Sequence, residues 1–131
     1  MSFTHKYAVY NGKLVYLAVN SNEAPPDDFW DPLIQTLREL ANSADEQVLL
    51  FVDAPASTGR PTSEQIQRLK GFPGKRFKVA LISDSMVIRG AIKPVKWMGY
   101  KIEAYPSTKR EDAMFFLGLY PEERAWLEGQ L

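Results

Sequence analysis

Residues 77–97 read FKVALISDSMVIRGAIKPVKW, and this stretch decides the fold. The apolar run Phe77–Ile82 predicts a strand, and apolar residues from about Met86 to Trp97 recur at helical spacing. Between them, Ser83–Ser85 offers three candidate N-caps for the helix. Because a helix that follows a strand directly often leads to a second, parallel strand, the stretch indicates an α/β fold.

Similar patterns predict the elements on either side. Asn11-Gly12 suits the positive φ angles of a two-residue hairpin turn, so we expect residues 6–10 and 13–19 to pair as strands. Apolar spacing and capping residues predict the remaining elements: a helix over 28–42, a buried strand over 48–53, a helix over 62–70, a strand over 101–105, a helix over 108–117 and a final helix from Pro121. This order predicts a mixed five-stranded sheet flanked by four to five α-helices.

Two of these helices have the spacing of a capping box at their start, in which two residues three apart exchange hydrogen bonds with each other's backbone. The pairs are Thr62 with Gln65 and Thr108 with Glu111. Gly118 is expected to end the second of these helices, because glycine readily ends a helix.

Length and composition fit one globular domain over residues 1–131. A chain of 131 residues has the usual size of a domain, and 45% hydrophobic with 24% charged residues excludes disordered, collagen-like and membrane-spanning classes. The start of the chain lacks the pattern of a signal peptide, and the longest clean apolar run is Val48–Val52. We therefore expect a cytoplasmic protein.

The residue types exclude several kinds of chemistry. The sequence has no cysteine, so disulfides, thiolate metal sites and cysteine nucleophiles are ruled out, and His5 is its single histidine. It contains no G-x-S-x-G elbow, H-E-x-x-H helix or phosphate-binding loop. We expect neither an enzyme nor a bound metal or cofactor.

Charge is distributed unevenly along the chain. Residues 1–65 hold four Lys/Arg against nine Asp/Glu, net −5, whereas residues 66–131 hold twelve against seven, net +5. Solvation of helix and loop surfaces accounts for such a distribution, and an anionic partner is the alternative. We expect no nucleic acid partner.

Three motifs in the carboxy-terminal third resemble those of a known family. They are KVALISDSMVIRGAIK at 78–93, KIEAYP at 101–106 and EDAMFFL at 111–117. Together with the predicted order of elements, they resemble the SpoIIAA-like branch, also called STAS/SEC14-like, of the STAS fold of bacterial anti-sigma factor antagonists. The amino-terminal half supports the resemblance through topology alone.

The resemblance implies a non-enzymatic regulatory module that binds a protein partner, sometimes under the control of a phosphorylated serine or threonine. In the family, the phosphoacceptor follows the third strand in an Asp-Ser-Ser-Gly-like motif. Here Ala54 follows Asp53, so the motif is absent in its usual register. Ser57 and Thr58 are the candidate phosphoacceptors if the loop is longer, and an ordinary polar loop is the alternative. Asp53 is a candidate binding residue, although we favour capping of a turn.

The helix predicted over 86–97 offers the most informative surface. Its basic side chains share a narrow arc and are candidate partner contacts: Arg89, Lys93 and Lys96. The neighbouring apolar arc, which includes Ala91 and Ile92, is expected to be buried. Trp97 is either covered by the last helix, which we favour, or left exposed as a binding anchor. Pro94 predicts a bend or an early helix end.

A second candidate function is a small-ligand or lipid carrier. The carboxyl ends of parallel strands and the amino ends of the following helices meet at one edge, where backbone donors attract anions. Candidate residues for an anionic headgroup at this edge are Asp53, Arg60, Ser83, Ser85 and Arg89. Simple solvation of the helix ends is the alternative. A homodimer, through the hairpin strand or through Trp97 and Trp126, stays open.

Overall fold

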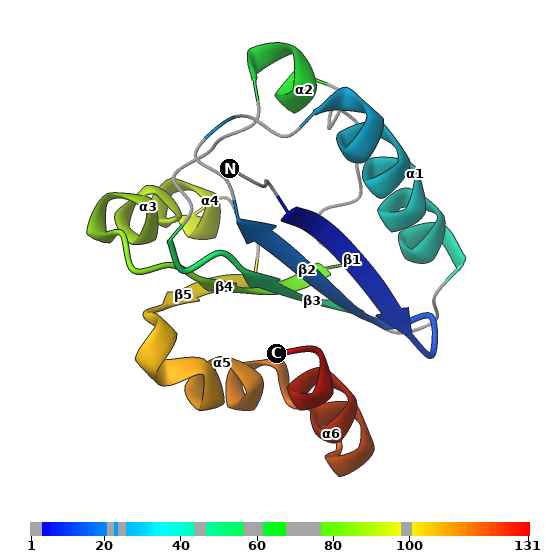
Figure 1. Ribbon diagram of the computed structural model, residues 1–131, viewed down its shortest axis with the longest axis vertical. Coiled ribbons are helices and arrows are strands. Elements are labelled where there is room, and N and C mark those ends of the chain that lie inside the picture. Colours follow the sequence, from blue (N-terminus) through cyan, green and yellow to red (C-terminus); the bar gives the residue numbers. More distant parts are fainter. Residues whose placement is uncertain are drawn as a thin grey trace.

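A five-stranded mixed sheet forms the centre of the molecule (Figure 1). The computed structural model describes residues 4–20, 23, 26–43, 47–56, 62–67, 77–97 and 101–131. The strands are β1 (Thr4–Tyr10), β2 (Leu14–Asn20), β3 (Val48–Asp53), β4 (Phe77–Ile82) and β5 (Lys101–Tyr105). They lie in the order of the sequence; β1 is antiparallel to β2, and every other pair is parallel. The predicted fold class is confirmed.

The hairpin between β1 and β2 forms where the sequence predicts it. Asn11 and Gly12 have φ angles of 54° and 63°, and the Lys13 N–H donates to the Tyr10 carbonyl at 3.1 Å. Asparagine and glycine tolerate this left-handed backbone better than other residues do. The turn therefore fixes the pairing of the first two strands.

The central strand β3 is buried on both sides, as its continuous apolar sequence predicts. Leu49 and Phe51 join one hydrophobic cluster, and Val48 and Leu50 join the other. Successive side chains of a strand point to opposite faces, so each face of the sheet carries its own core. Each core needs helices to cover it.

Helices cover the two faces unequally (Figure 1). On one side lie α1 (Asp27–Ser43), α2 (Ser63–Gln67), α3 (Met86–Ala91) and α4 (Lys93–Trp97). On the other side lie α5 (Arg110–Leu117) and α6 (Pro121–Gln130). Leu33, Leu37 and Ala41 of α1 pack into the core that contains Val48 and Leu50. Met114 and Leu127 pack into the core that contains Leu49 and Phe51.

One of the two predicted capping boxes is present. The Thr62 N–H donates to the Gln65 side chain at 2.9 Å, and the Gln65 N–H donates to the Thr62 hydroxyl at 3.2 Å. The box predicted for Thr108 and Glu111 is wrong. A 3₁₀ turn, Ser107–Lys109, stands before α5, and the helix has no side-chain cap of its own.

The helix predicted over 86–97 is two short helices. Pro94 has no N–H to donate to the Gly90 carbonyl, and the helix is interrupted at Ile92, between α3 and α4. The expectation that the apolar arc is buried is wrong for Ala91, which is exposed, and α3 has no buried residue. The segment therefore lies on the surface.

Candidate functional site

The carboxyl ends of β3, β4 and β5 meet at one edge of the sheet. The Asp84 N–H donates to the Pro55 carbonyl at 3.0 Å, and the Ser83 N–H donates to the Tyr105 carbonyl at 2.9 Å. Backbone hydrogen bonds thus connect the loop after β4 to the loop after β3 and to the end of β5. The loop after β4 leads directly into α3.

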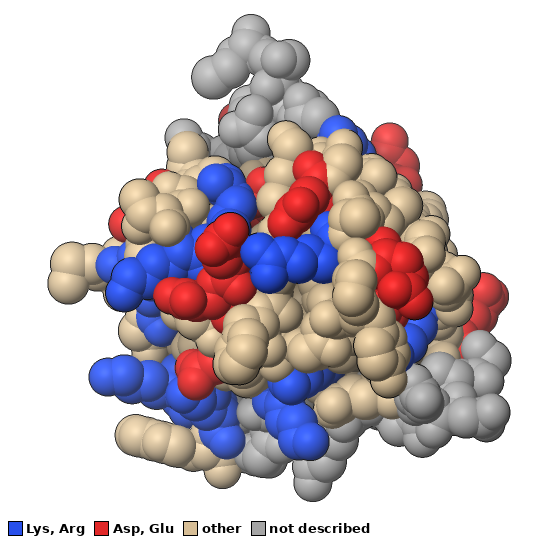
Figure 2. Space-filling view, turned by 90° about the horizontal axis from the view of Figure 1, so that it is seen from below, with Lys and Arg blue, Asp and Glu red and all other residues tan. Residues whose placement is uncertain are grey.

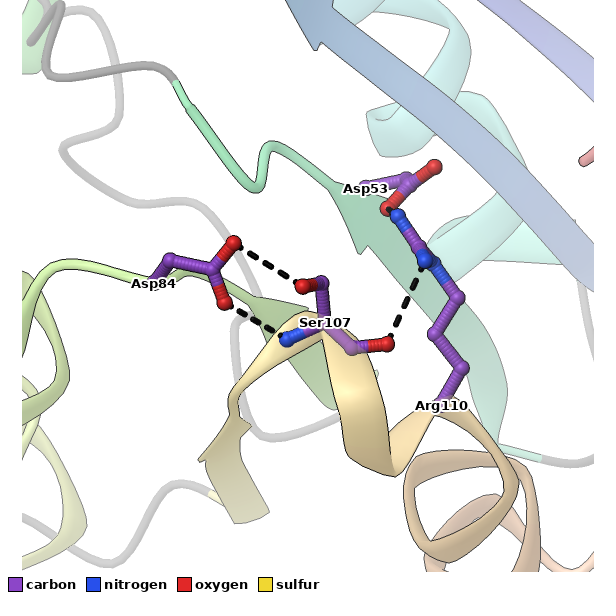
Figure 3. A network of polar contacts seen from close by, with 4 residues as sticks. All are labelled: Asp53, Asp84, Ser107 and Arg110. Atoms are coloured by element: carbon purple, nitrogen blue, oxygen red, sulfur yellow. Dashed lines mark hydrogen bonds and ion pairs between the residues drawn. The ribbon is translucent and has the colours of Figure 1, made fainter.

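A network of side chains links the same loops (Figure 3). One carboxylate oxygen of Asp84 accepts the Ser107 N–H at 2.8 Å, and the other accepts the Ser107 hydroxyl at 2.9 Å. Arg110 donates from Nη1 to the Ser107 carbonyl at 3.2 Å. It also donates from Nε and Nη2 to one oxygen of Asp53, at 3.2 and 2.9 Å. The network ties α5 both to β3 and to the loop that leads into α3.

Hydrogen bonding fixes the charge of Asp84. The backbone N–H of Ser107 and then its hydroxyl lower the pKa of this carboxyl below its ordinary value, and the positive charges of Arg89 and Arg110 act in the same direction. Asp84 is therefore ionised at neutral pH, and it acts as an acceptor for the first residue of the 3₁₀ turn.

Asp53 has a different role from the expected turn cap. Its carboxylate forms an ion pair with Arg110, and the two side chains are 14% and 31% exposed. Sequence reasoning missed both Ser107 and Arg110. The sequence offers one weak signal, because Arg110 lies in the first turn of the predicted helix, where a cation is placed unfavourably toward the helix dipole.

Tyr16 lies close to this ion pair and is 4% exposed. Burial raises the pKa of its hydroxyl, the charge of Asp53 raises it further, and Arg110 opposes the shift. The ring stacks on Phe51, with centroids 6.5 Å apart. No described residue forms a hydrogen bond with the Tyr16 hydroxyl.

The candidate residues at the start of α3 make local contacts. The buried Ser83 hydroxyl accepts the Ser85 N–H at 3.2 Å, and the Ser85 hydroxyl accepts the Ile88 N–H at 3.3 Å as the N-cap of α3. Arg89 donates from Nη1 to the Ser83 carbonyl at 3.3 Å. These contacts explain the presence of Ser83 and Ser85 by a structural role, because both residues help to form the start of α3. Ser57, Thr58 and Arg60 lie outside the described residues.

Exposed apolar side chains gather on the segment that follows. We call residues 86–97 of α3 and α4 the α3–α4 surface. Met86, Val87 and Trp97 are 79%, 69% and 83% exposed. The expectation that the last helix covers Trp97 is wrong, because α6 packs on the opposite side of the sheet (Figure 1).

Three basic residues accompany these apolar side chains. Lys96 forms an ion pair with Glu103 of β5 at 2.7 Å, and Arg89 is held by the Ser83 carbonyl. Lys93 is exposed, and it has no acidic partner in the part of the chain that the structure describes. The segment 86–97 contains no Asp or Glu. The α3–α4 surface is therefore both apolar and basic.

The face formed by α5 and α6 has a different character. Figure 2 shows acidic and basic side chains interspersed over the middle of this view, with basic side chains more frequent toward its lower edge. Ion pairs such as Arg124 with Glu128, at 2.9 Å, contribute to this pattern. No group of three acidic or histidine side chains in the described ranges could hold a metal ion, and no described helix is long and apolar enough to cross a membrane.

Comparison with known proteins identifies the fold. No protein-family model and no curated protein matches the chain. A crystal structure of an uncharacterized protein of the DUF3478 family from Shewanella loihica PV-4, described as having a SpoIIAA-like fold, matches with a TM-score of 0.61. The chain has a SpoIIAA-like fold. The match covers 88% of this chain and 93% of the other at 14% identity, so the SpoIIAA-like fold is what the two proteins share.

Proposed function

We propose that this chain is a non-enzymatic regulatory module that binds a partner protein through the α3–α4 surface. The observation that carries the proposal is the exposure of Met86, Val87 and Trp97 on a segment of twelve residues, 86–97. Large apolar side chains that gather on a surface mark interaction sites, and tryptophan is enriched among the residues that dominate binding energy. The SpoIIAA-like fold is consistent with this role.

Affinity measurements test the proposal. The purified chain is used as bait in extracts of the source cells, and a candidate partner is then produced separately and titrated calorimetrically. We expect Trp97→Ser to weaken binding about tenfold or more, because the complex loses an aromatic anchor that the partner would cover. Phe115→Ser is the matched control, because Phe115 is 87% exposed but lies on α5. Equal effects of the two substitutions would reject the α3–α4 surface.

The carrier function has less support from the geometry. A site for an anionic headgroup at the carboxyl ends of the strands needs cations that are available to a ligand. Arg110 is instead paired with Asp53, and Arg89 is partly engaged by the Ser83 carbonyl. Native mass spectrometry of freshly purified protein distinguishes the two functions, since a carrier retains extra mass and a partner module does not. A cytoplasmic location stays a prediction, and a homodimer stays open.

A further inference from the structure

The charges of the α3–α4 surface define what kind of partner it fits. Lys93 and Trp97 are four residues apart in α4, so they are neighbours on one side of that helix. Met86 and Arg89 have the corresponding spacing of three in α3. Met86 and Trp97 therefore each have a cation beside them, and no acidic residue lies within the segment 86–97.

Resting on the proposed function, we infer that the partner presents an acidic amphipathic segment, in which apolar side chains contact Trp97 and Met86 while carboxylates pair with Lys93 and Arg89. Lys93 has no acidic partner among the described residues. Arg89 uses one N–H for the Ser83 carbonyl, and a guanidinium has five. Carboxylates are the acceptors that form the strongest hydrogen bonds with both groups.

A second copy of this chain fits the surface poorly. A two-fold contact would bring the α3–α4 surface against itself, because the same patch is used on both subunits. Lys93 and Arg89 of each copy would then face cations, with no acidic residue in 86–97 to separate them. Like charges brought together in this way oppose association.

An anionic membrane also fits less well than a protein segment. Attraction to such a membrane is weak for a single basic residue, so membrane binding depends on clusters of several basic residues. Of the three basic residues here, Lys96 is already paired with Glu103 and Arg89 is partly engaged. A protein segment needs only one or two carboxylates placed beside an apolar anchor.

Peptide selection tests the inference without a known partner. A phage library of random peptides is selected on the immobilised full chain, and the enriched peptides are synthesised and titrated. We expect enrichment of peptides in which Asp or Glu flanks aromatic or aliphatic residues. Lys93→Glu should weaken their binding about tenfold, and Lys109→Glu, an exposed basic residue outside the surface, should leave it unchanged.

The outcomes separate the inference from the proposed function. Peptides that depend on Trp97 but lack acidic residues would overturn the inference and leave the proposed function intact. No enrichment, or binding that Trp97→Ser does not alter, would overturn both. Stronger binding to vesicles of equal parts phosphatidylcholine and phosphatidylglycerol than to any peptide would assign the surface to membranes and overturn the inference.

Discussion

Arg110, the first residue of α5, donates two hydrogen bonds to a single carboxylate oxygen of Asp53, the last residue of β3. The two residues are 57 positions apart in the chain, and the Asp53 side chain is only 14% exposed. The pair therefore joins α5 to the centre of the sheet. Its charges are partly shielded from water, so each partner depends on the other.

Removal of Arg110 should destabilise the protein, because Asp53 would be left as a poorly solvated charge. We expect Arg110→Met to lower the free energy of unfolding by about 1–3 kcal/mol in urea at neutral pH. The double variant Asp53→Asn with Arg110→Met should recover part of the loss. Arg124→Met is the control, since exposed ion pairs such as those of Arg124 contribute little to stability. Equal losses for the two arginines would contradict a special role for the Asp53 pair.

Tyr16→Phe should leave the fold intact and stabilise it slightly. The Tyr16 hydroxyl is buried beside the ion pair without a hydrogen bond to any described residue, and burying such a group costs free energy. We expect the free energy of unfolding to rise by up to about 1 kcal/mol in urea titrations. A fall in the free energy of unfolding would instead mean that the hydroxyl has a stabilising partner, such as a bound water.

The elements that the sequence predicts well are those fixed by local patterns. Asn11-Gly12 forms the hairpin turn because its residues tolerate positive φ, and Val48–Asp53 forms the central strand because its apolar run suits burial on both faces. Thr62 and Gln65 exchange their hydrogen bonds across one helical turn. In each case the deciding contacts join residues close in sequence, or depend on burial alone.

Contacts between distant residues could not be predicted in the same way. The Thr108 capping box fails because Asp84, 23 positions before Ser107, supplies the acceptors for the start of the 3₁₀ turn. The prediction that the last helix covers Trp97 also fails, because it depends on which side of the sheet that helix packs against. Periodicity gives the apolar side of a helix, but only packing decides whether that side meets a partner within the chain.

The contact between Asp84 and Ser107 should make stability depend on acid pH. Since the pKa of Asp84 is lower in the folded chain than its ordinary value of 3.8, folding favours the ionised carboxyl. Its contribution is fully present above the unfolded pKa and is lost as pH falls through the folded pKa. We expect the stability difference between the natural chain and Asp84→Asn to be constant above about pH 5 and to shrink below about pH 4. If the stability difference stays constant down to about pH 2, ionisation of the Asp84 carboxyl is not its cause.

Substitution of two glycines by alanine should have opposite effects. Gly118 ends α5 with φ 70° and ψ 40°, a left-handed conformation, whereas Gly129 lies within α6. A Cβ atom added at either position meets no atom within 4 Å, so steric contact with neighbours does not separate them. Gly118→Ala should cost about 1–2 kcal/mol through backbone strain, and Gly118→Asn less. Gly129→Ala should stabilise the protein by up to about 1 kcal/mol, because alanine has the higher helix propensity. Urea unfolding measures both changes, and a loss of stability in Gly129→Ala that matches Gly118→Ala would show that backbone conformation is not the cause.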